Sequence, residues 1–372
     1  MIKTGGKNWK VILIPFSWLY GLVIWIRNSL YDNGFFKSSA FPIPLISVGN
    51  ITVGGTGKTP HVEYLAELLN SKFKLATLSR GYKRRTRDFR IATANSNVSE
   101  IGDEPLQIKK RFPGIDVAVD RKRANGIREL MNLAPWLEVI LMDDAYQHRS
   151  VKPGFSILLI DYARPIDQDH LLPAGMLREP ASNLNRANII LVTRSPERIK
   201  PIEFREYVNR LNLSMGQHLY FTTMRYGDLA PVYPDTTTRN AAWFKKHAGG
   251  VLIVAGIANP RPLRQYARSI STNISELFFP DHHEYTRKDM EKISSQYLEL
   301  LNLHQEVLVL TTEKDAMRLR DHNPEPRLRA AMHAVRIHVH FLNDDKEEFD
   351  RQILTYVSSN KRNSILYQEE NS

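Results

Sequence analysis

Short apolar runs alternate with amphipathic stretches along most of the chain from Phe41 onward. Near-continuous apolar runs of this length are typical of strands that are covered on both faces in a parallel sheet. They predict strands over residues 44–48, 74–78, 116–119, 139–142, 156–160 and 189–192, with helices over 59–69, 121–132 and 201–211. This alternation favours an α/β fold with a doubly wound, mostly parallel sheet.

A second and shorter series of the same kind begins after about residue 220. It predicts strands over 251–255, 307–311 and 336–341, with helices over 262–269, 287–300 and 346–358. Residues 224–246 between the two series are polar and rich in turn-forming residues, so we place a domain junction there. We predict a first domain over residues 37–224, a smaller α/β domain over 225–360 and a disordered tail over 361–372.

The N-terminal segment is apolar in a different way. Residues 11–26 read VILIPFSWLYGLVIWI, with lysines before the run and Arg27 after it. A bilayer-spanning helix needs roughly 20 apolar residues, and no small-x-small signal cleavage site follows this shorter run. The aromatic residues within it favour a helix seated in the lipid headgroup region. We therefore predict a membrane-associated helix over residues 1–36, with a buried core helix as the alternative.

Composition narrows the classes of partner. Apolar residues make up 42% and charged residues 24% of the chain, as in ordinary globular proteins. The net charge of +11 predicts an anionic partner: nucleic acid, a phospholipid surface or a phosphorylated substrate. The chain has no cysteine, which excludes disulfides, thiol nucleophiles and zinc–thiolate sites and suits a reducing cytoplasm.

The most informative motif is ISVGNITVGGTGKTP at residues 46–60, where a predicted buried strand runs through a glycine-rich turn into a helix. Glycines allow successive backbone amides to surround phosphate oxygens at a helix N-terminus. Lys58 is expected to reach the β- and γ-phosphates of a nucleotide, and the Thr59 hydroxyl to bind Mg²⁺. Thr52 stands where the general phosphate-loop pattern has its first glycine.

A matching acidic pair follows another predicted strand. Asp143 and Asp144 come directly after the apolar residues 139–142. Ligands bind at the carboxyl ends of strands in open α/β sheets, and carboxylates there can hold Mg²⁺ directly or through water. A plain turn is the alternative for this pair alone.

The phosphate acceptor must be inferred from the remaining motifs. The chain has no Asn-Lys-x-Asp motif of a guanine-nucleotide switch, and Thr-Glu-Lys-Asp at 312–315 echoes it only superficially. A kinase needs a base for the acceptor hydroxyl and cations for the developing charge. Two carboxylates, Asp103 and Glu104, lie in a predicted loop at 102–105, and the segment 279–284 carries Asp281, His282 and His283. An aspartate of one domain could pair with a histidine of the other when the two domains close, although solvated loop carboxylates and histidines that only cap or pack are the alternatives. Basic loops at 80–85 and 120–123 lie at the ends of predicted strands, although solvated surface charge is the alternative.

Several of these motifs, taken in order, resemble the tetraacyldisaccharide 4′-kinase family of the lipid A pathway of Gram-negative bacteria. The resemblance rests on the apolar N-terminal segment and on residues 48–60, 79–82, 102–105, 143–148, 173–180, 279–282 and 312–315. Members of this family commonly lack the first glycine of the phosphate-loop pattern, the position that Thr52 occupies here. The family usually has Gly-Phe where this chain has Ala145-Tyr146, and proline where it has Met176. Alanine loses access to positive φ, so a family glycine in that conformation would require a different loop here.

The resemblance implies a reaction in which ATP phosphorylates the 4′-hydroxyl of a tetraacylated glucosamine disaccharide 1-phosphate, giving the 1,4′-bisphosphate. It implies that Asp103 acts as the base with His282 assisting, and that Arg178 and Glu179 belong to the phosphate and metal environment. It further implies ATP binding by Gly54, Gly55, Thr56, Gly57, Lys58 and Thr59, Mg²⁺ binding by Thr59, Asp143 and Asp144, and substrate binding by Arg80, Tyr82, Arg121, Arg123, His148 and Arg178. The expected setting is a monomer on the cytoplasmic face of the bacterial inner membrane, with a lipid disaccharide and no nucleic acid as partner.

Two other functions remain as alternatives. A phosphate-loop ATPase acting on nucleic acid would account for the positive charge, and its activity would respond to DNA or RNA rather than to a glycolipid. A nucleotide-dependent membrane switch without enzyme activity would keep the phosphate loop and tolerate the loss of Asp103 and His282. Both leave the carboxylate and histidine motifs unexplained.

Overall fold

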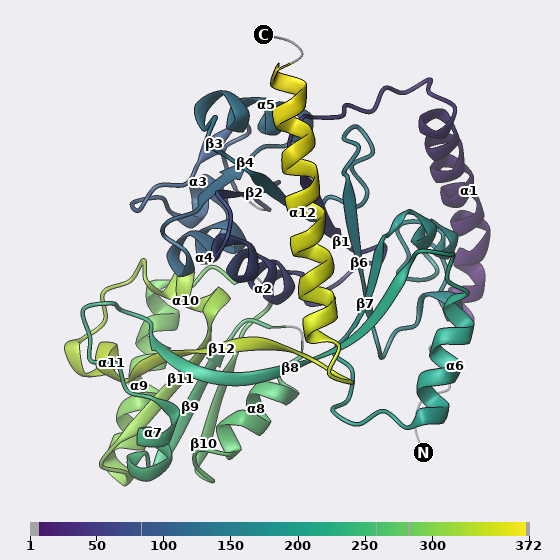
Figure 1. The fold of residues 1–372 in the computed structure, drawn as a ribbon. Helices are drawn as coiled ribbons and strands as arrows, with labels where there is room; N and C mark the ends of the chain where they lie inside the picture. The colour runs from purple at the N-terminus through teal and green to yellow at the C-terminus, as the bar shows by residue number, and fades with distance from the viewer. Residues whose placement is uncertain (1–6, 83, 258, 282, 370–372) are drawn as a thin grey trace.

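The computed structural model describes residues 7–82, 84–257, 259–281 and 283–369 (Figure 1). Within these residues the strands form one twelve-stranded sheet with the order β10-β9-β11-β12-β8-β7-β6-β1-β5-β2-β4-β3. Neighbouring strands are parallel except for two pairs, β8 with β12 and β3 with β4. The fold is thus the mostly parallel α/β architecture that the alternating pattern predicts.

The first half of the sheet carries the predicted strands within about one residue at each end. Its parallel strands are β1 (Leu45–Gly49), β2 (Leu75–Ser79), β4 (Asp116–Val119), β5 (Val139–Asp143), β6 (Phe155–Asp161) and β7 (Ile189–Thr193), with the short edge strand β3 (Arg90–Ile91). Its helices include α2 (Lys58–Asn70), α3 (Val98–Ile101), α4 (Asp103–Arg111), α5 (Arg123–Leu133) and α6 (Pro201–Leu211). Every residue of β1, β2, β5 and β7 is buried, as expected for strands covered on both faces.

The second half repeats the pattern on a smaller scale. Its strands are β9 (Gly250–Ala255), β10 (Ile274–Phe278), β11 (Val307–Thr312) and β12 (Met332–Phe341). Its helices are α7 (Ala241–His247), α8 (Arg261–Arg268), α9 (Arg287–Leu303), α10 (Glu313–Leu319) and α11 (Pro326–Ala331). The strands and helices predicted in this region are confirmed, whereas β10, α7, α10 and α11 are additional.

Two elements join the halves. Strand β8 (His218–Pro231) pairs in parallel with β7 near its start and antiparallel with β12 along the rest, so one strand crosses the predicted junction at residue 224. Helix α12 (Lys346–Glu369) crosses back over the first half, where Tyr356 Oη donates a hydrogen bond to the Leu45 carbonyl at 3.3 Å. It also extends as helix to residue 369, through most of the segment for which the sequence predicts disorder. The division into domains therefore remains a prediction.

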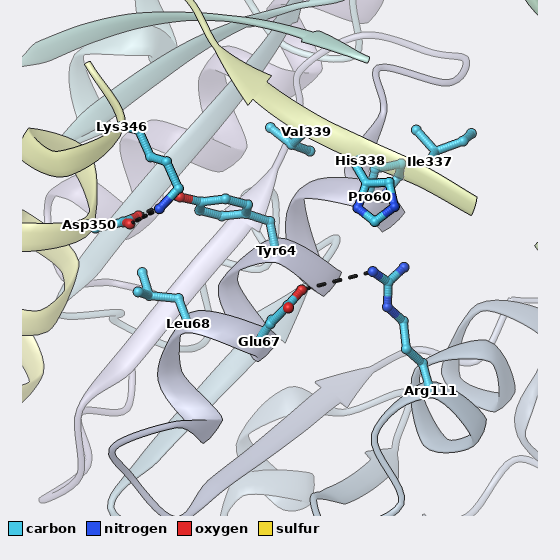
Figure 2. Close-up of a pocket in the computed structure, with 10 residues that line it drawn as sticks. All are labelled: Pro60, Tyr64, Glu67, Leu68, Arg111, Ile337, His338, Val339, Lys346 and Asp350. Atoms are coloured by element: carbon cyan, nitrogen blue, oxygen red, sulfur yellow. Dashed lines mark hydrogen bonds and ion pairs between the residues drawn. The ribbon is translucent and has the colours of Figure 1, made fainter. Parts of the chain in front are cut away.

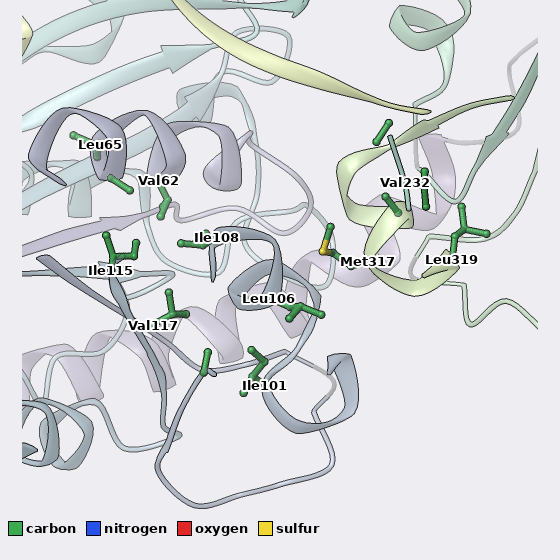
Figure 3. Close-up of a cluster of buried hydrophobic side chains, with 14 of the residues drawn as sticks. Val62, Leu65, Ile101, Leu106, Ile108, Ile115, Val117, Val232, Met317 and Leu319 are labelled. Carbon is green, nitrogen blue, oxygen red and sulfur yellow. The ribbon is translucent and has the colours of Figure 1, made fainter. Parts of the chain in front are cut away.

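One hydrophobic cluster runs through both halves (Figure 3). Val62 and Leu65 of α2 and Leu106 of α4 belong to it, together with Met317 and Leu319 of α10 in the second half. Helices α4 and α10 pack directly on one another. Asp103, which the sequence places in a loop, is instead the first residue of α4, so this prediction of local structure is wrong.

Helix α1 (Lys7–Asp32) lies at the edge of the molecule, in purple in Figure 1. It holds the one stretch in the described residues that is long and apolar enough to cross a membrane, Ile12–Asp32, and only 11% of the apolar window in it is buried. Trp18 is 72% exposed and Trp25 is 63% exposed. The alternative of a buried core helix is therefore wrong for the described side chains.

A cavity of about 260 Å³ opens between α2, β12 and α12 (Figure 2). Pro60 and Tyr64 of α2, Arg111 of α4 and Lys346 of α12 are among its lining residues. Pro60 ends the phosphate-loop motif, but none of the predicted site residues lines this cavity.

Candidate active site

The phosphate loop connects β1 to α2 and is held by its own side chains. Gly54 and Gly57 have positive φ, 99° and 80°, which glycine adopts without steric cost. Asn50 Nδ2 donates to Thr56 Oγ1 at 3.0 Å, and Asn50 Oδ1 accepts from Lys58 Nζ at 3.4 Å. From β7, Thr193 Oγ1 donates to the Thr56 carbonyl at 2.8 Å. The loop is thus fixed in a curled form at the start of α2, where backbone amides favour an anion.

The acidic pair lies opposite the loop lysine. Asp143 ends β5 and is buried, and Asp144 follows with φ 48°. Lys58 Nζ lies 3.3 Å from Asp144 Oδ1. Burial and the neighbouring Asp144 raise the pKa of Asp143 to about 6. Burial acts in the same direction on Asp144, but Lys58 and Arg178 outweigh it and hold that pKa below its ordinary value.

The geometry fits a magnesium ion bound together with a nucleotide. Asp143 Oδ1 is buried and has no hydrogen-bond partner among the described residues, so it is available to a cation or its water. No group of three His, Cys, Asp or Glu side chains suited to a metal occurs in the part of the chain that the structure describes. Phosphate-loop proteins do not need one, because a loop hydroxyl, phosphate oxygens and water complete the shell. Thr59, on the first turn of α2, carries a hydroxyl of this kind.

Asp103 lies buried at the N-terminus of α4 and contacts the second half of the molecule. Its Oδ2 accepts from Arg318 Nη2 of α10 at 2.7 Å. Arg318 Nη1 also donates to the His283 carbonyl at 3.0 Å. His282 lies outside the described residues, so the predicted pairing of Asp103 with His282 stays a prediction.

The basic loops divide into exposed and buried cations. Arg80 and Arg121 are exposed at the ends of β2 and β4, and Tyr82 is exposed beside them. Arg123 is 1% exposed: Nη1 donates to the Asp120 carbonyl at 2.7 Å and Nη2 to the Asp143 carbonyl at 3.0 Å. The structure therefore does not present Arg123 to a ligand, because its guanidinium is enclosed between the ends of β4 and β5.

The segment 170–180 connects the acidic pair to α1. Arg178 Nη1 lies 3.9 Å from Asp144 Oδ2 and donates to Gln147 Oε1 at 3.3 Å. Its backbone carbonyl accepts from Tyr20 Oη of α1 at 2.9 Å. Glu179 is buried and pairs with Arg186 and with Arg27 of α1. Helix α1 thus borders the candidate site directly.

His148 lies partly buried on the loop after the acidic pair. Burial, and then the charge of Arg123, lower its pKa to about 4. At neutral pH His148 is therefore uncharged, and its ring can donate a hydrogen bond from one nitrogen and accept one at the other.

The three departures from the family pattern are accommodated locally. The positive φ near the acidic pair belongs to Asp144, and Ala145 has an ordinary φ, so alanine causes no strain. Tyr146 packs over Gly49, where a Cβ would lie 2.7 Å from Tyr146 Cβ. Met176 is partly exposed, and its carbonyl accepts from the Val53 amide at 2.7 Å.

Sequence reasoning missed several residues that shape the site. Asn50 lies inside the phosphate-loop motif, where its side chain contacts Thr56 and Lys58. Glu104, the second carboxylate of the predicted loop at 102–105, lies next to Asp103, and burial and then the charges of Asp143 and Asp103 raise its pKa to about 7. Arg164 and Arg194 both bind Asp161 and lie beside Gly54 and Gly55. Asn50 could have been found from its place in the motif at 46–60. Arg164 and Arg194 could not, because their approach depends on how β6 pairs with β1 and β7 with β6.

The fold and the site define a phosphate-loop phosphotransferase: a parallel sheet presents a glycine loop, a lysine and two strand-end carboxylates at one edge. The model of the LpxK family, tetraacyldisaccharide-1-P 4′-kinase, matches residues 9–358. The chain is 47% identical over 360 residues to the tetraacyldisaccharide 4′-kinase of Phocaeicola vulgatus, covering 95% of this chain and 96% of that one. It is 43% identical to the enzyme of the same name from Bacteroides thetaiotaomicron, covering 97% and 96%.

A solved structure agrees with these sequence relatives. The crystal structure of LpxK from Aquifex aeolicus in complex with ATP has a TM-score of 0.72 and 28% identity, covering 94% of this chain and 99% of that one. The chain belongs to the tetraacyldisaccharide 4′-kinase family. It is a phosphotransferase, an ATP-dependent 4′-kinase of lipid A biosynthesis. The resemblance inferred from the sequence motifs is confirmed.

Proposed function

We propose that this chain transfers the γ-phosphate of ATP to the 4′-hydroxyl of a tetraacyldisaccharide 1-phosphate with Asp103 as the base. One observation carries the proposal: the phosphate loop, the pair Asp143 and Asp144, and the buried carboxylate of Asp103 converge on one edge of the sheet. The charges of Asp143, Asp103 and Lys58 all act on the pKa of Glu104, which lies among them. A nucleotide phosphate on the loop and a hydroxyl beside Asp103 would then be neighbours.

The reaction follows from these positions. The loop amides and Lys58 bind the β- and γ-phosphates. Asp103 accepts the proton of the 4′-hydroxyl while the oxygen of that hydroxyl forms a bond to the γ-phosphorus. The bond from that phosphorus to the β–γ bridging oxygen breaks, and ADP leaves with the electron pair. Mg²⁺ held by Thr59 and the strand-end carboxylates would neutralise phosphate charge.

The exposed basic loops suit the sugar and its 1-phosphate. Arg80 and Arg121 are free to approach an anionic headgroup at the ends of β2 and β4. Tyr82, His148 and Arg178 can contact sugar hydroxyls or phosphate from the neighbouring loops. Arg123 donates to the carbonyls of Asp120 and Asp143 and is assigned no direct contact with substrate.

Helix α1 suits an enzyme whose substrate stays in a bilayer. Its outer face exposes Trp18 and Trp25, while Tyr20 and Arg27 reach the loops of the site. Tryptophan is favoured at membrane interfaces. We propose a monomer on the cytoplasmic face of the inner membrane, where ATP is available and only the headgroup of the lipid enters the site.

The test is phosphate transfer from labelled ATP to the tetraacyldisaccharide 1-phosphate in detergent micelles. We expect product from the wild type and losses on the order of 100-fold or more for Lys58→Ala and Asp103→Ala. Lys72→Ala, at an exposed turn beyond α2, is the control and should retain full activity. Transfer that survives Asp103→Ala would remove Asp103 as the base. Hydrolysis stimulated by DNA or RNA, with no glycolipid phosphorylation, would favour the nucleic-acid alternative.

A further inference from the structure

Ion pairs join helices α4 and α10 at both ends of α4. In one pair α4 supplies the acidic residue, and in the other it supplies the basic residue. At its N-terminus, Asp103 of α4 binds Arg318 of α10 at 2.7 Å. At its C-terminus, Arg111 of α4 lies 3.6 Å from Glu313 of α10. Helix α4 belongs to the first half of the sheet and α10 to the second, so the position of Asp103 depends on contact between the halves.

The motif at 312–315 builds the start of α10. The Thr312 side chain caps the helix by accepting from the Asp315 amide at 3.1 Å, and Asp315 Oδ2 accepts from the Gly256 amide at 3.1 Å. Lys314 Nζ lies 2.9 Å from Asp281 Oδ1. The motif thus fixes α10 against the end of β9 and against the segment that precedes His283, which gives it a role other than recognition of a nucleotide base.

The contact between Arg318 and Asp103 is buried on both sides. The Arg318 side chain is 7% exposed and that of Asp103 is 2% exposed. Charge-assisted bonds from a guanidinium fix the orientation of a carboxylate, and removing one partner of a buried pair leaves the other charge uncompensated. Arg318 also donates to the His283 carbonyl. One guanidinium therefore holds both the Asp103 carboxylate of the first half and the loop at His283 in the second half.

We propose that Arg318 is a positioning residue for phosphate transfer: it orients the Asp103 carboxylate toward the acceptor hydroxyl when α10 is seated on α4. This inference rests on the proposed function, in which Asp103 is the base. Arg318 itself exchanges no proton and forms no covalent bond. Its loss should therefore reduce turnover rather than the binding of ATP, which involves the phosphate loop and not Arg318.

The experiment compares Arg318→Met and Arg318→Lys in the wild-type chain and in Asp103→Asn. We expect Arg318→Met to lower kcat by on the order of 100-fold with the KM for ATP nearly unchanged, and Arg318→Lys to recover part of it. In the Asp103→Asn background the same Arg318→Met change should cost no more than about twofold, because Arg318 acts through that carboxylate. A purely structural role would instead cost the same factor in both backgrounds.

The matched control is Arg320→Met, at the end of the same helix. Arg320 is partly buried, and its Nε donates to the Val232 carbonyl rather than to α4. Melting temperatures of all variants separate loss of folding from loss of turnover. A kcat for Arg318→Met no lower than that of Arg320→Met, or an equal loss in both backgrounds, would overturn the inference. A wild type that transfers no phosphate would overturn the proposed function first, before any variant is compared.

Discussion

At the scale of single residues, the phosphate loop is supported by a buried histidine of the helix that follows it. His61 is fully buried on α2: one ring nitrogen, Nδ1, lies 2.8 Å from the Gly57 carbonyl, and Nε2 lies 2.9 Å from Thr222 Oγ1. A carbonyl only accepts, so Nδ1 carries the proton and Nε2 accepts from the threonine hydroxyl. The neutral ring thereby connects the loop to β8, and burial lowers the pKa of His61 to about 4.

This depressed pKa makes stability depend on pH. Between about pH 6.5 and pH 4 the unfolded chain binds a proton at His61 that the folded chain does not, so the free energy of unfolding falls as the pH falls. The loss from this group should reach roughly 2 kcal/mol at pH 5 relative to pH 7. Urea unfolding at both pH values, for the wild type and for His61→Asn, measures it. Identical changes with pH in the two proteins would show that His61 is not the group responsible.

At the scale of elements, α1 has two different faces. Its inner face makes specific contacts: Ser17 Oγ donates to the Leu171 carbonyl at 2.8 Å, and Gly21 allows close approach, since a Cβ there would lie 2.8 Å from Leu171 Cδ1. Its outer face exposes large apolar side chains, including Phe16, Trp18, Leu22 and Trp25. An exposed apolar surface of this kind marks an interaction site. The inner face of α1 contacts the loops of the candidate active site, so we infer that the outer face binds the membrane that holds the lipid substrate.

The outer face gives a prediction that separates membrane binding from folding. The double change Trp18→Ser with Trp25→Ser should lower partitioning onto anionic phospholipid vesicles by about tenfold or more, because each buried aromatic contributes roughly 1.5–3 kcal/mol. Stability and turnover on a soluble substrate analogue should be unchanged. Vesicle cosedimentation measures the effect, with Trp136→Ser, 59% exposed elsewhere on the molecule, as the control. Equal binding by both variants would contradict a membrane role for α1.

The elements also show how far sequence reasoning reaches. The phosphate loop and the strand ends at Asp143 were predictable because each is a local pattern in one stretch of chain. Strand β8 was not, because its polar residues and prolines resemble a turn-rich linker, and it is stabilised by pairing with β12 more than a hundred residues later. Arg318 was missed for the same reason: its partner, Asp103, is distant in sequence, and nothing local distinguishes it from a surface arginine.

At the scale of the whole molecule, the two halves share a sheet and a core. Phe349, Ile353 and Val357 of α12 are buried at helical spacing in the hydrophobic cluster that runs through both halves. The Phe349 ring lies 4.7 Å from that of Phe341 and 6.0 Å from that of Tyr64 on α2. The helix that begins at the phosphate loop is thus packed against strand and helix from the far end of the chain. Such contacts predict that the halves unfold together.

Phe349→Ala tests this coupling. Removing a fully buried aromatic side chain should cost about 3–5 kcal/mol of stability. Because Phe349 packs in the hydrophobic cluster that both halves share, the loss of stability should appear equally in the unfolding of both halves. Two single-tryptophan variants, keeping Trp136 in the first half or Trp243 in the second, report each half by fluorescence during urea unfolding. In the otherwise unchanged chain their transitions should coincide, and with Phe349→Ala both should move to lower urea together. A shift of one transition alone would mean that the continuous sheet joins two separately stable units, and that the contact between Arg318 and Asp103 can open without unfolding either.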